Sequence, residues 1–215
     1  MPFAGWPPQA LDFLSELEAN NDRDWFKAER PRYEEHLVAP AKALGEELAS
    51  LGRFKLFRPF NDQRFHARPP IKEQLAVAFL AGTGAGGYVE LSLDGLFVAA
   101  GLYDPQPDQV ARLREAVDDG RRSAGLTKAI LRCEEAGLAL PEPDLKRVPR
   151  GYESDHPRAE LLRRKRMVAS VRWPLEPWLH TAACGTRIAD ALEATRPLSR
   201  WLAEHVGPST HARRT

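Results

Sequence analysis

Apolar residues recur at helical spacing along the first quarter of the chain. Leucines at steps of three between Leu11 and Leu17 predict a short amphipathic helix, which the polar run at residues 20–22 ends. A longer apolar pattern runs through residues 37–51 in steps of four and three, and it stops at Gly52. Glycine commonly follows the last residue of a helix, so we expect the second helix to end there.

Residues that can cap a helix precede three later apolar patterns. Asp108, Ser123 and Asp155 each stand before such a pattern, where a side-chain oxygen can accept the free backbone N–H groups of the first turn. We expect the helix after Ser123 to end near Gly137, and the helix after Asp155 to run through Lys165. Two further helices are expected, around Trp178 and over residues 186–206.

Stretches rich in β-forming residues predict a small antiparallel sheet. Residues 88–93 and 96–103 flank Asp94-Gly95, a dipeptide favoured in two-residue hairpin turns because both residues tolerate a positive φ. Residues 57–65 and 167–173 are weaker strand candidates that can complete the sheet. Helices outnumber strands and no βαβ order is visible, so we expect an α+β fold: a small antiparallel sheet with a central hairpin, covered by several helices.

The chain length of 215 residues favours one large domain. We expect that domain at residues 1–206, followed by a polar, frayed tail at residues 207–215. No apolar segment reaches the roughly 20 residues that span a bilayer, and the first residues lack the basic and apolar stretches of a signal peptide. A cytoplasmic protein without a membrane partner is therefore expected.

The overall charge limits the classes of partner that are expected. Lys and Arg number 31 against 30 for Asp and Glu, so the net charge of +1 gives no global attraction to nucleic acid. Any anion site must be local. The cysteines, Cys133 and Cys184, are far apart and lack the Cys/His spacing of a zinc site, which predicts buried thiols. No metal motif or nucleophile elbow is present, and the cofactor is left open.

Positive charge is concentrated between Lys146 and Arg166. On a helix that begins at Asp155, Arg158 and Lys165 are seven residues apart and lie along one stripe. The forked guanidinium donors of arginine suit phosphate or carboxylate, so this stripe can face an anionic ligand. The alternative is a solvated surface or a set of structural ion pairs.

Four blocks, spread over most of the chain, carry a likeness to a known family. They are residues 10–14 and 20–26 with Arg30, Tyr33 and Pro40; residues 62–65 and 70–72; residues 101–103 with Leu113, Arg114 and Ala116; and residues 145–152 and 155–163 with Lys165. Together they resemble DUF2461, a widespread family of uncharacterised bacterial, fungal and plant proteins. The resemblance implies a fold and candidate residues, and carries no activity across.

The chain departs from this family pattern at one loop. Relatives usually carry Ser-Lys-Asp-Lys-Thr where this chain has His66-Ala67-Arg68-Pro69, so the usual acid and lysines are missing. If the loop holds the family's active groups, this member has altered or lost activity. If the loop is a surface connection, nothing follows.

We expect a basic cleft that binds a phosphorylated or otherwise anionic small molecule. The ligand-binding candidates are Arg64, Lys72, Arg150, Arg158 and Lys165. An enzyme would add His156 and Asp62 as proton-transfer groups, whereas structural roles for them are a cap neighbour and an ion pair with Arg64.

Two other function classes stay open. A nucleic-acid-binding module would use the same basic segment on a broad positive surface, which the near-neutral overall charge makes the weaker candidate. A protein-interaction domain without catalysis would present Trp178 and Trp201 on its C-terminal helices. The oligomeric state is left open.

Overall fold

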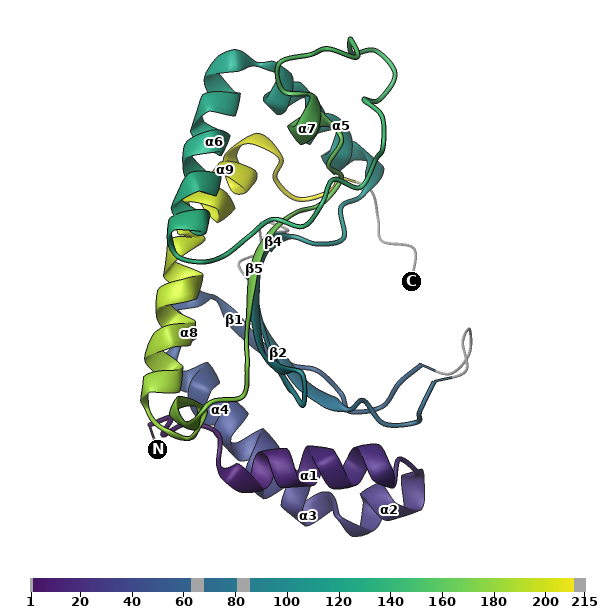
Figure 1. Cartoon of the computed structure of the whole chain (residues 1–215), viewed down its shortest axis with the longest axis vertical. Coiled ribbons are helices and arrows are strands. Elements are labelled where there is room, and N and C mark those ends of the chain that lie inside the picture. Colours follow the sequence, from purple (N-terminus) through teal and green to yellow (C-terminus); the bar gives the residue numbers. More distant parts are fainter. Residues whose placement is uncertain (1, 63–67, 81–85, 211–215) are drawn as a thin grey trace. The chain divides into compact units, whose positions relative to one another are not determined.

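The fold is built around a five-stranded sheet whose strands pair in sequence order, β1-β2-β3-β4-β5 (Figure 1). The computed structural model describes residues 2–62, 68–80 and 86–210. The strands are β1 (Arg53–Leu56), β2 (Gln74–Leu80), β3 (Gly86–Ser92), β4 (Gly95–Leu102) and β5 (Met167–Trp173). With an antiparallel sheet and several helices, the predicted α+β fold is confirmed.

The helices divide into two groups along the chain. The first group comprises α1 (Pro8–Ala19), α2 (Arg23–Ala28), α3 (Arg30–Tyr33), the π-helical turn η1 (Glu34–Val38), α4 (Ala39–Glu47) and the 3-10 turn η2 (Ala49–Leu51). The second comprises α5 (Pro107–Asp118), α6 (Gly120–Glu135), α7 (Ala159–Leu162), the 3-10 turn η3 (Pro177–His180), α8 (Ala183–Ala194) and α9 (Arg196–His205). The helix expected at residues 11–17 is confirmed as part of α1. Residues 37–51 are helical but divided among η1, α4 and η2, and the single helix expected at residues 186–206 is divided into α8 and α9.

The chain forms two compact units. The first unit comprises Met1–Phe79, Tyr88–Val98 and Arg172–Asp190. The second unit comprises Leu80–Gly87, Ala99–Val171 and Ala191–Thr215. The expectation of one domain over residues 1–206 stays a prediction.

In the first unit, aromatic rings from α1, α2 and α3 form a small core. Phe26 lies 5.1 Å from Tyr33 and 6.4 Å from Phe13, ring centroid to ring centroid, and all three side chains are buried. Edge-to-face packing of this kind favours fixed ring positions. Asp22 begins α2, because its carboxylate accepts the N–H groups of Asp24 and Trp25.

The β3–β4 hairpin is confirmed, but its turn differs from the prediction. The turn residues are Leu93 and Asp94, and Gly95 begins β4 with φ +121°. Asp94 has a negative φ, so the expected turn with positive φ at both Asp94 and Gly95 is wrong. Gly95 also lies against β5: an added Cβ would come within 2.1 Å of the Trp173 carbonyl oxygen.

The remaining strand predictions had mixed outcomes. The strand at residues 167–173 is confirmed as β5. The strand expected at residues 57–65 is not present over the described residues 57–62, where β1 has ended at Leu56 and an isolated bridge joins Phe60 to Ile71; residues 63–65 lie outside the described residues. The strand that pairs with β1 is β2, an apolar run that the period-two pattern did not reveal.

In the second unit, each predicted cap is displaced by a few residues. Gln106, not Asp108, is the N-cap of α5, and Asp119, not Ser123, caps α6 by accepting the Arg122 N–H. Ser123 is buried inside α6, which ends at Glu135, close to the expected Gly137. A helix around Trp178 is present as the short turn η3.

The helix expected to begin near Asp155 is also shorter than predicted. It is α7, which begins at Ala159 and ends at Leu162, so Asp155 does not cap it and Lys165 lies outside it. The Asp155 cap and the stripe of Arg158 and Lys165 on one helix are therefore wrong. Turns and bends occupy the chain before α7.

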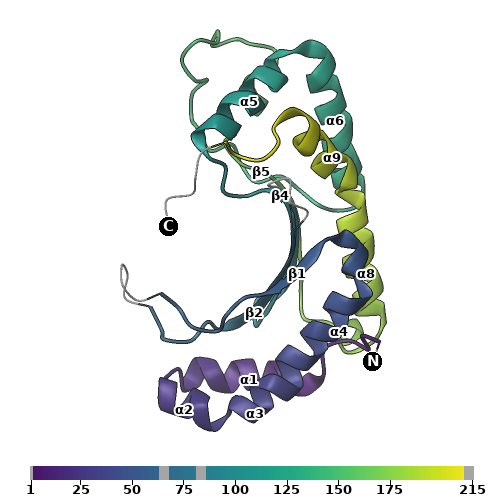
Figure 2. The same cartoon turned by 180° about the vertical axis from the view of Figure 1, so that it is seen from behind.

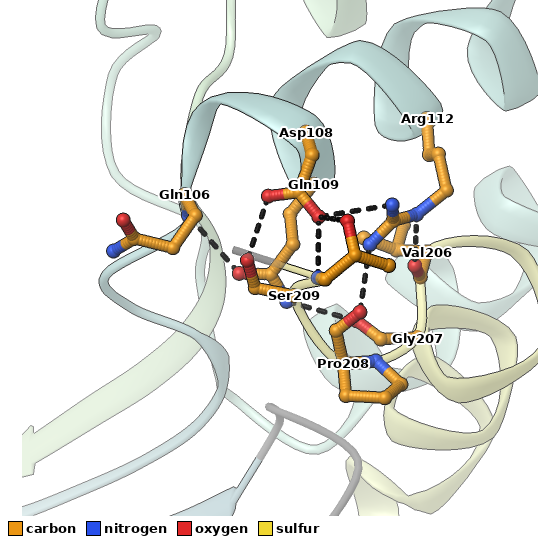
Figure 3. Close-up of polar contacts among 9 residues, drawn as sticks. Gln106, Asp108, Gln109, Arg112, Val206, Gly207, Pro208 and Ser209 are labelled. Atoms are coloured by element: carbon orange, nitrogen blue, oxygen red, sulfur yellow. Dashed lines mark hydrogen bonds and ion pairs between the residues drawn. The ribbon is translucent and has the colours of Figure 1, made fainter. Parts of the chain in front are cut away.

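The segment after α9 is anchored to α5 (Figure 3). Arg112 donates from its guanidinium to the Pro208 carbonyl at 2.8 Å, and Gln109 donates to the Gly207 carbonyl at 2.8 Å. Asp108 accepts the Ser209 hydroxyl at 2.8 Å and the Thr210 N–H at 2.9 Å. The frayed tail predicted from Gly207 is thus wrong for residues 207–210, and residues 211–215 lie outside the described residues.

Candidate anion-binding site

The strands of the first unit have an apolar face and a polar face. Leu75, Val77 and Phe79 of β2 are fully or almost fully buried, and the Phe79 ring lies 6.0 Å from that of Phe54. Phe54 in turn lies directly against Gly45 of α4, and Figures 1 and 2 show α4 and α8 on one side of these strands. Side chains alternate between the two faces of a strand, so the residues between these apolar ones point to the other side.

This second surface, the polar face, is formed by side chains from all five strands or from residues beside them. Their mutual contacts define the face, and most of them are at least partly exposed. The members are Lys55, Phe57, Lys72, Gln74, Tyr88, Glu90, Ser92, Phe97 and Arg172.

Three aromatic rings cross the polar face in a row. The Tyr88 ring lies 6.0 Å from Phe57 and 6.1 Å from Phe97, both in edge-to-face arrangements. Phe57 donates its N–H to the carbonyl of Ala76 on β2, which pairs with β3. The small Ala76 side chain therefore leaves space above β2 for the two larger rings to meet. This aromatic row is Phe57, Tyr88 and Phe97.

Glu90 is the hydrogen-bonded centre of the polar face. One carboxylate oxygen accepts the Tyr88 hydroxyl at 2.6 Å and the Gln74 amide at 2.7 Å. The other accepts the Arg172 guanidinium at 3.3 Å. These donors satisfy a carboxylate whose side chain is only 13% exposed. Glu90 therefore holds the neighbouring polar groups in place.

Arg172 is held less tightly than Glu90. Its second donor reaches Ser92 at 3.4 Å, a long hydrogen bond, and its guanidinium lies 4.8 Å from the Phe97 ring. The Arg172 side chain is 39% exposed. A guanidinium that lies over a ring and has long, weak hydrogen bonds can still bind an incoming carboxylate or phosphate in a two-pronged contact.

Three more cations gather at the β1–β2 side of the polar face. The ammonium groups of Lys55 and Lys72 lie 4.8 Å and 5.9 Å from the Phe57 ring centroid. The Lys72 ammonium donates to the backbone carbonyl of Arg58 at 3.0 Å. Within the described ranges 2–62, 68–80 and 86–210, no carboxylate forms an ion pair with Lys55, Arg58 or Lys72.

The grouping of these cations affects the pKa of Lys72. Burial lowers the pKa of its ammonium, and the nearby positive charges of Arg58 and Lys55 lower it further. Both causes act in the same direction because each disfavours the charged amine. A bound anion would relieve the repulsion among these three cations.

Among the residues predicted for the site, Lys72 lies on the polar face. Arg64 lies outside the described residues, so its predicted role is not tested. Asp62 is exposed and follows the Phe60–Ile71 bridge, in a stretch that is not a strand. The expectation that Asp62 and Arg64 share one face of a strand depends on Arg64, so it too lies outside the described residues.

Arg158 has a structural role in the second unit. Its Nε donates to the Val117 carbonyl at 2.7 Å, and an Nη donates to the Asp118 carbonyl. These carbonyls end α5, where the helix dipole is negative and the last acceptors lack partners within the helix. Arg158 thus caps the C-terminus of α5 with its Nε and one Nη donor.

His156 is held at both ring nitrogens. Nδ1 accepts the Arg158 N–H at 3.1 Å, so the proton resides on Nε2, which donates to the Asp118 carboxylate at 3.0 Å. The side chain is 14% exposed. A general base needs a free lone pair beside its substrate, and here the lone pair of the neutral ring is already used. This geometry favours the structural role for His156.

Other members of the basic segment also have structural partners. Arg164 is buried and pairs with Glu160 at 2.9 Å, and Arg166 pairs with Asp144 at 2.7 Å. The N–H of Lys165 donates to Asp144, while the Lys165 side chain is exposed. Arg150 is exposed in the turn before Gly151. A cleft that joins Arg150, Arg158 and Lys165 to Lys72 stays a prediction.

Comparison with known proteins assigns the family. A family model described as "Conserved hypothetical protein (DUF2461)" matches residues 9–201, which is most of the chain. The chain belongs to the DUF2461 family. No curated protein and no solved structure is significantly similar to it. The predicted DUF2461 membership is thereby confirmed.

The described part of this DUF2461 protein has neither a cluster of metal ligands nor a membrane-spanning helix. No three His, Cys, Asp or Glu side chains within it gather closely enough to hold a metal ion. None of its described helices is both long and apolar enough to cross a membrane. The two cysteines are buried and unpaired, as predicted.

Sequence reasoning missed most of the polar face. The missed members are Lys55, Phe57, Gln74, Tyr88, Glu90, Ser92, Phe97 and Arg172, and the cation Arg58 beside them was missed as well. One signal was available: Tyr88, Glu90 and Ser92 alternate with apolar residues, which places them together on one side of β3. Their partners on β1, β2 and β5 depend on strand order and register, which the alternation within one strand does not give.

Proposed function

We propose that this protein binds an anionic small molecule on the polar face of its first unit. The observation that carries the proposal is the group of three cations, Lys55, Arg58 and Lys72, without a paired carboxylate among the described residues. Positive charges held close together favour an anion between them, because each cation raises the free energy of the others. Phosphate and carboxylate are the groups that such donors bind best.

The aromatic row gives the ligand a second recognition element. Phe57, Tyr88 and Phe97 are each partly exposed, so they offer apolar surface between the three cations and Arg172. A ligand that carries an anionic group next to an apolar body fits this combination. In the bound state we expect Arg172 to exchange its long contacts to Glu90 and Ser92 for a shorter contact with the ligand.

Two alternatives carry less support. Trp201 is buried and donates its indole N–H to the Arg122 carbonyl, which removes it from any surface that binds a partner. Nucleic acid would need a broad basic surface, and several arginines of the basic segment have structural partners instead. We also propose a cytoplasmic location, which the two unpaired thiols support because reducing compartments keep cysteines free.

Calorimetric titration with inorganic phosphate, and then with a set of carboxylates, tests the proposal. We expect Arg58→Gln and Arg172→Gln each to weaken binding by roughly tenfold, or about 1.4 kcal/mol. Lys128→Gln is the charge-matched control, since Lys128 is exposed on α6 in the second unit. Equal affinity in all four proteins would reject the site, and binding of single-stranded oligonucleotides without binding of small anions would favour the nucleic-acid alternative.

A further inference from the structure

Lys72 stands out among the lysines because of its surroundings. Its ammonium makes one hydrogen bond, to the Arg58 carbonyl, and lies near the Phe57 ring rather than near a carboxylate. The side chain is half-buried, whereas that of Lys55 is exposed. A lysine in a structural ion pair would have an acidic partner, and the described part of the chain places none within 4.0 Å of Lys72.

These surroundings favour the neutral amine. Burial, then the charges of Arg58 and Lys55, lower the pKa of Lys72. The neutral amine has a free lone pair and is a nucleophile, whereas the ammonium form is not. Enzymes that use lysine as a covalent nucleophile activate it by the same two means, partial desolvation and an adjacent cation.

We propose that Lys72 forms a Schiff base with the carbonyl group of a 2-oxo acid. The proposal rests on the anion-binding function above and assigns a reaction to the same site. A 2-oxo acid carries its carboxylate directly beside its ketone. The Lys55 and Lys72 ammonium groups lie 4.8 Å and 5.9 Å from the same Phe57 ring, and the charges of Arg58 and Lys55 act on Lys72. We therefore place the carboxylate of the substrate against Lys55 and Arg58, and its ketone carbon against the Lys72 amine.

The step balances without an oxidant, a reductant or a metal. The Lys72 nitrogen lone pair forms a bond to the ketone carbon, and the carbonyl π pair moves to the oxygen, which takes a proton. The nitrogen then loses a proton, the hydroxyl group leaves as water after a second protonation, and a C=N bond remains. Positive charge from Arg58 and Lys55 stabilises the carboxylate throughout but disfavours protonation of the amine, which keeps Lys72 reactive.

Nearby polar groups are suited to position the substrate rather than to react. Glu90 accepts hydrogen bonds from Tyr88 and Gln74 on one carboxylate oxygen, and these hold it in place when Arg172 turns to the ligand. The Phe57 ring lies 5.9 Å from the Lys72 ammonium and offers apolar surface beside it. The apolar part of the oxo acid would then lie along the aromatic row.

Trapping with borohydride tests this proposal on the full-length wild-type protein. Pyruvate is added, the imine is reduced with sodium borohydride, and peptide mass spectrometry locates the modified lysines. We expect modification at Lys72 at neutral pH at least tenfold faster than at the exposed lysines Lys27 and Lys128. Lys72→Arg should abolish this signal, because a guanidinium keeps the positive charge and does not form the imine.

The outcomes separate the two proposals. Trapping at Lys72 with loss in Lys72→Arg supports the Schiff base. Phosphate binding without preferential trapping at Lys72 overturns the Schiff base and leaves the anion site standing. Absence of both phosphate binding and trapping overturns both. As a further check, Arg58→Gln should slow trapping at neutral pH and shift its pH profile upward, whereas equal profiles would contradict activation by Arg58.

Discussion

Tyr88 and Glu90, two residues apart on β3, are joined by a hydrogen bond of 2.6 Å from the phenol to the carboxylate. This contact fixes the centre of the polar face, because the same carboxylate also binds Gln74 and Arg172. The polar face is therefore a connected network, and its members should respond to substitution in different ways.

Glu90→Gln should strengthen the binding of phosphate. The substitution removes the negative charge that faces Arg172 and leaves a side chain of nearly the same shape. Without the opposing carboxylate, the positive charge of Arg172 attracts an incoming anion more strongly. A several-fold gain in phosphate affinity is expected, consistent with about 0.5–1 kcal/mol for a partly exposed ion pair. Calorimetry with phosphate measures it. Tyr88→Phe is the control: it removes a donor without changing charge and should leave affinity within about twofold. Weaker binding by Glu90→Gln would contradict this account of Arg172.

Arg158→Gln should destabilise the protein without affecting anion binding. Arg158 donates to the last carbonyls of α5, and loss of charged hydrogen bonds costs about 1.5–3 kcal/mol. Urea unfolding measures the loss, and phosphate titration should show unchanged affinity. Arg150→Gln is a suitable control, since Arg150 is exposed and should unfold like wild type. If Arg158→Gln weakened phosphate binding while Arg150→Gln did not, Arg158 would belong to the site after all.

Gly95→Ala and Gly137→Ala form a matched pair of substitutions. Both glycines have positive φ, +121° and +80°, so alanine is strained at either position. At Gly137 nothing lies within 4 Å of the new methyl group, and a cost of about 1 kcal/mol is expected. At Gly95 the methyl would come within 2.1 Å of the Trp173 carbonyl oxygen, so strand β5 must shift. The midpoint of thermal unfolding should be well below that of Gly137→Ala in the Gly95→Ala variant. Equal midpoints would contradict the β4–β5 packing.

The lowered pKa of Lys72 predicts a pH dependence of stability. Since the pKa of Lys72 in the folded protein lies below the ordinary lysine value of 10.5, the unfolded chain binds more protons between the two pKa values. The free energy of unfolding contributed by Lys72 should thus rise as pH increases through that window. Lys72→Met, which cannot be protonated, should remove this rise. The comparison requires urea unfolding of both proteins from pH 7 to pH 10.5, and parallel pH profiles would show that Lys72 is protonated equally in both states.

The elements that could be predicted from sequence are those with a strong local signal. The hairpin around Leu93 has such a signal and is present, and the weaker candidate at residues 167–173 is present as β5. The β2 strand was missed because residues 75–80 are uniformly apolar and give no period of two, as is common for buried strands.

The candidate site was harder to predict than the helices and strands, because it depends on tertiary contacts. Asp155 and Pro157 are good signals for a helix start, yet α7 begins later, after the turns in which His156 contacts Asp118 and Arg158. Lys72 was chosen from the family likeness, and its neighbours Lys55 and Arg58 come from a different part of the chain. Local patterns do not specify which cations lack acidic partners, since that follows from the folded arrangement.

Phosphate titration of a variant that lacks two of the three clustered cations tests the central claim most directly. Arg58→Gln/Lys72→Gln removes two charges from the polar face, and Arg121→Gln/Lys128→Gln removes two exposed charges from α6 as a control. Both variants have the same net charge, so any difference in phosphate affinity reflects where the removed charges lie. We predict that the first variant loses phosphate binding by at least tenfold, roughly 1.4 kcal/mol, while the control binds like wild type. Equal affinity in the two variants would contradict an anion site on the polar face.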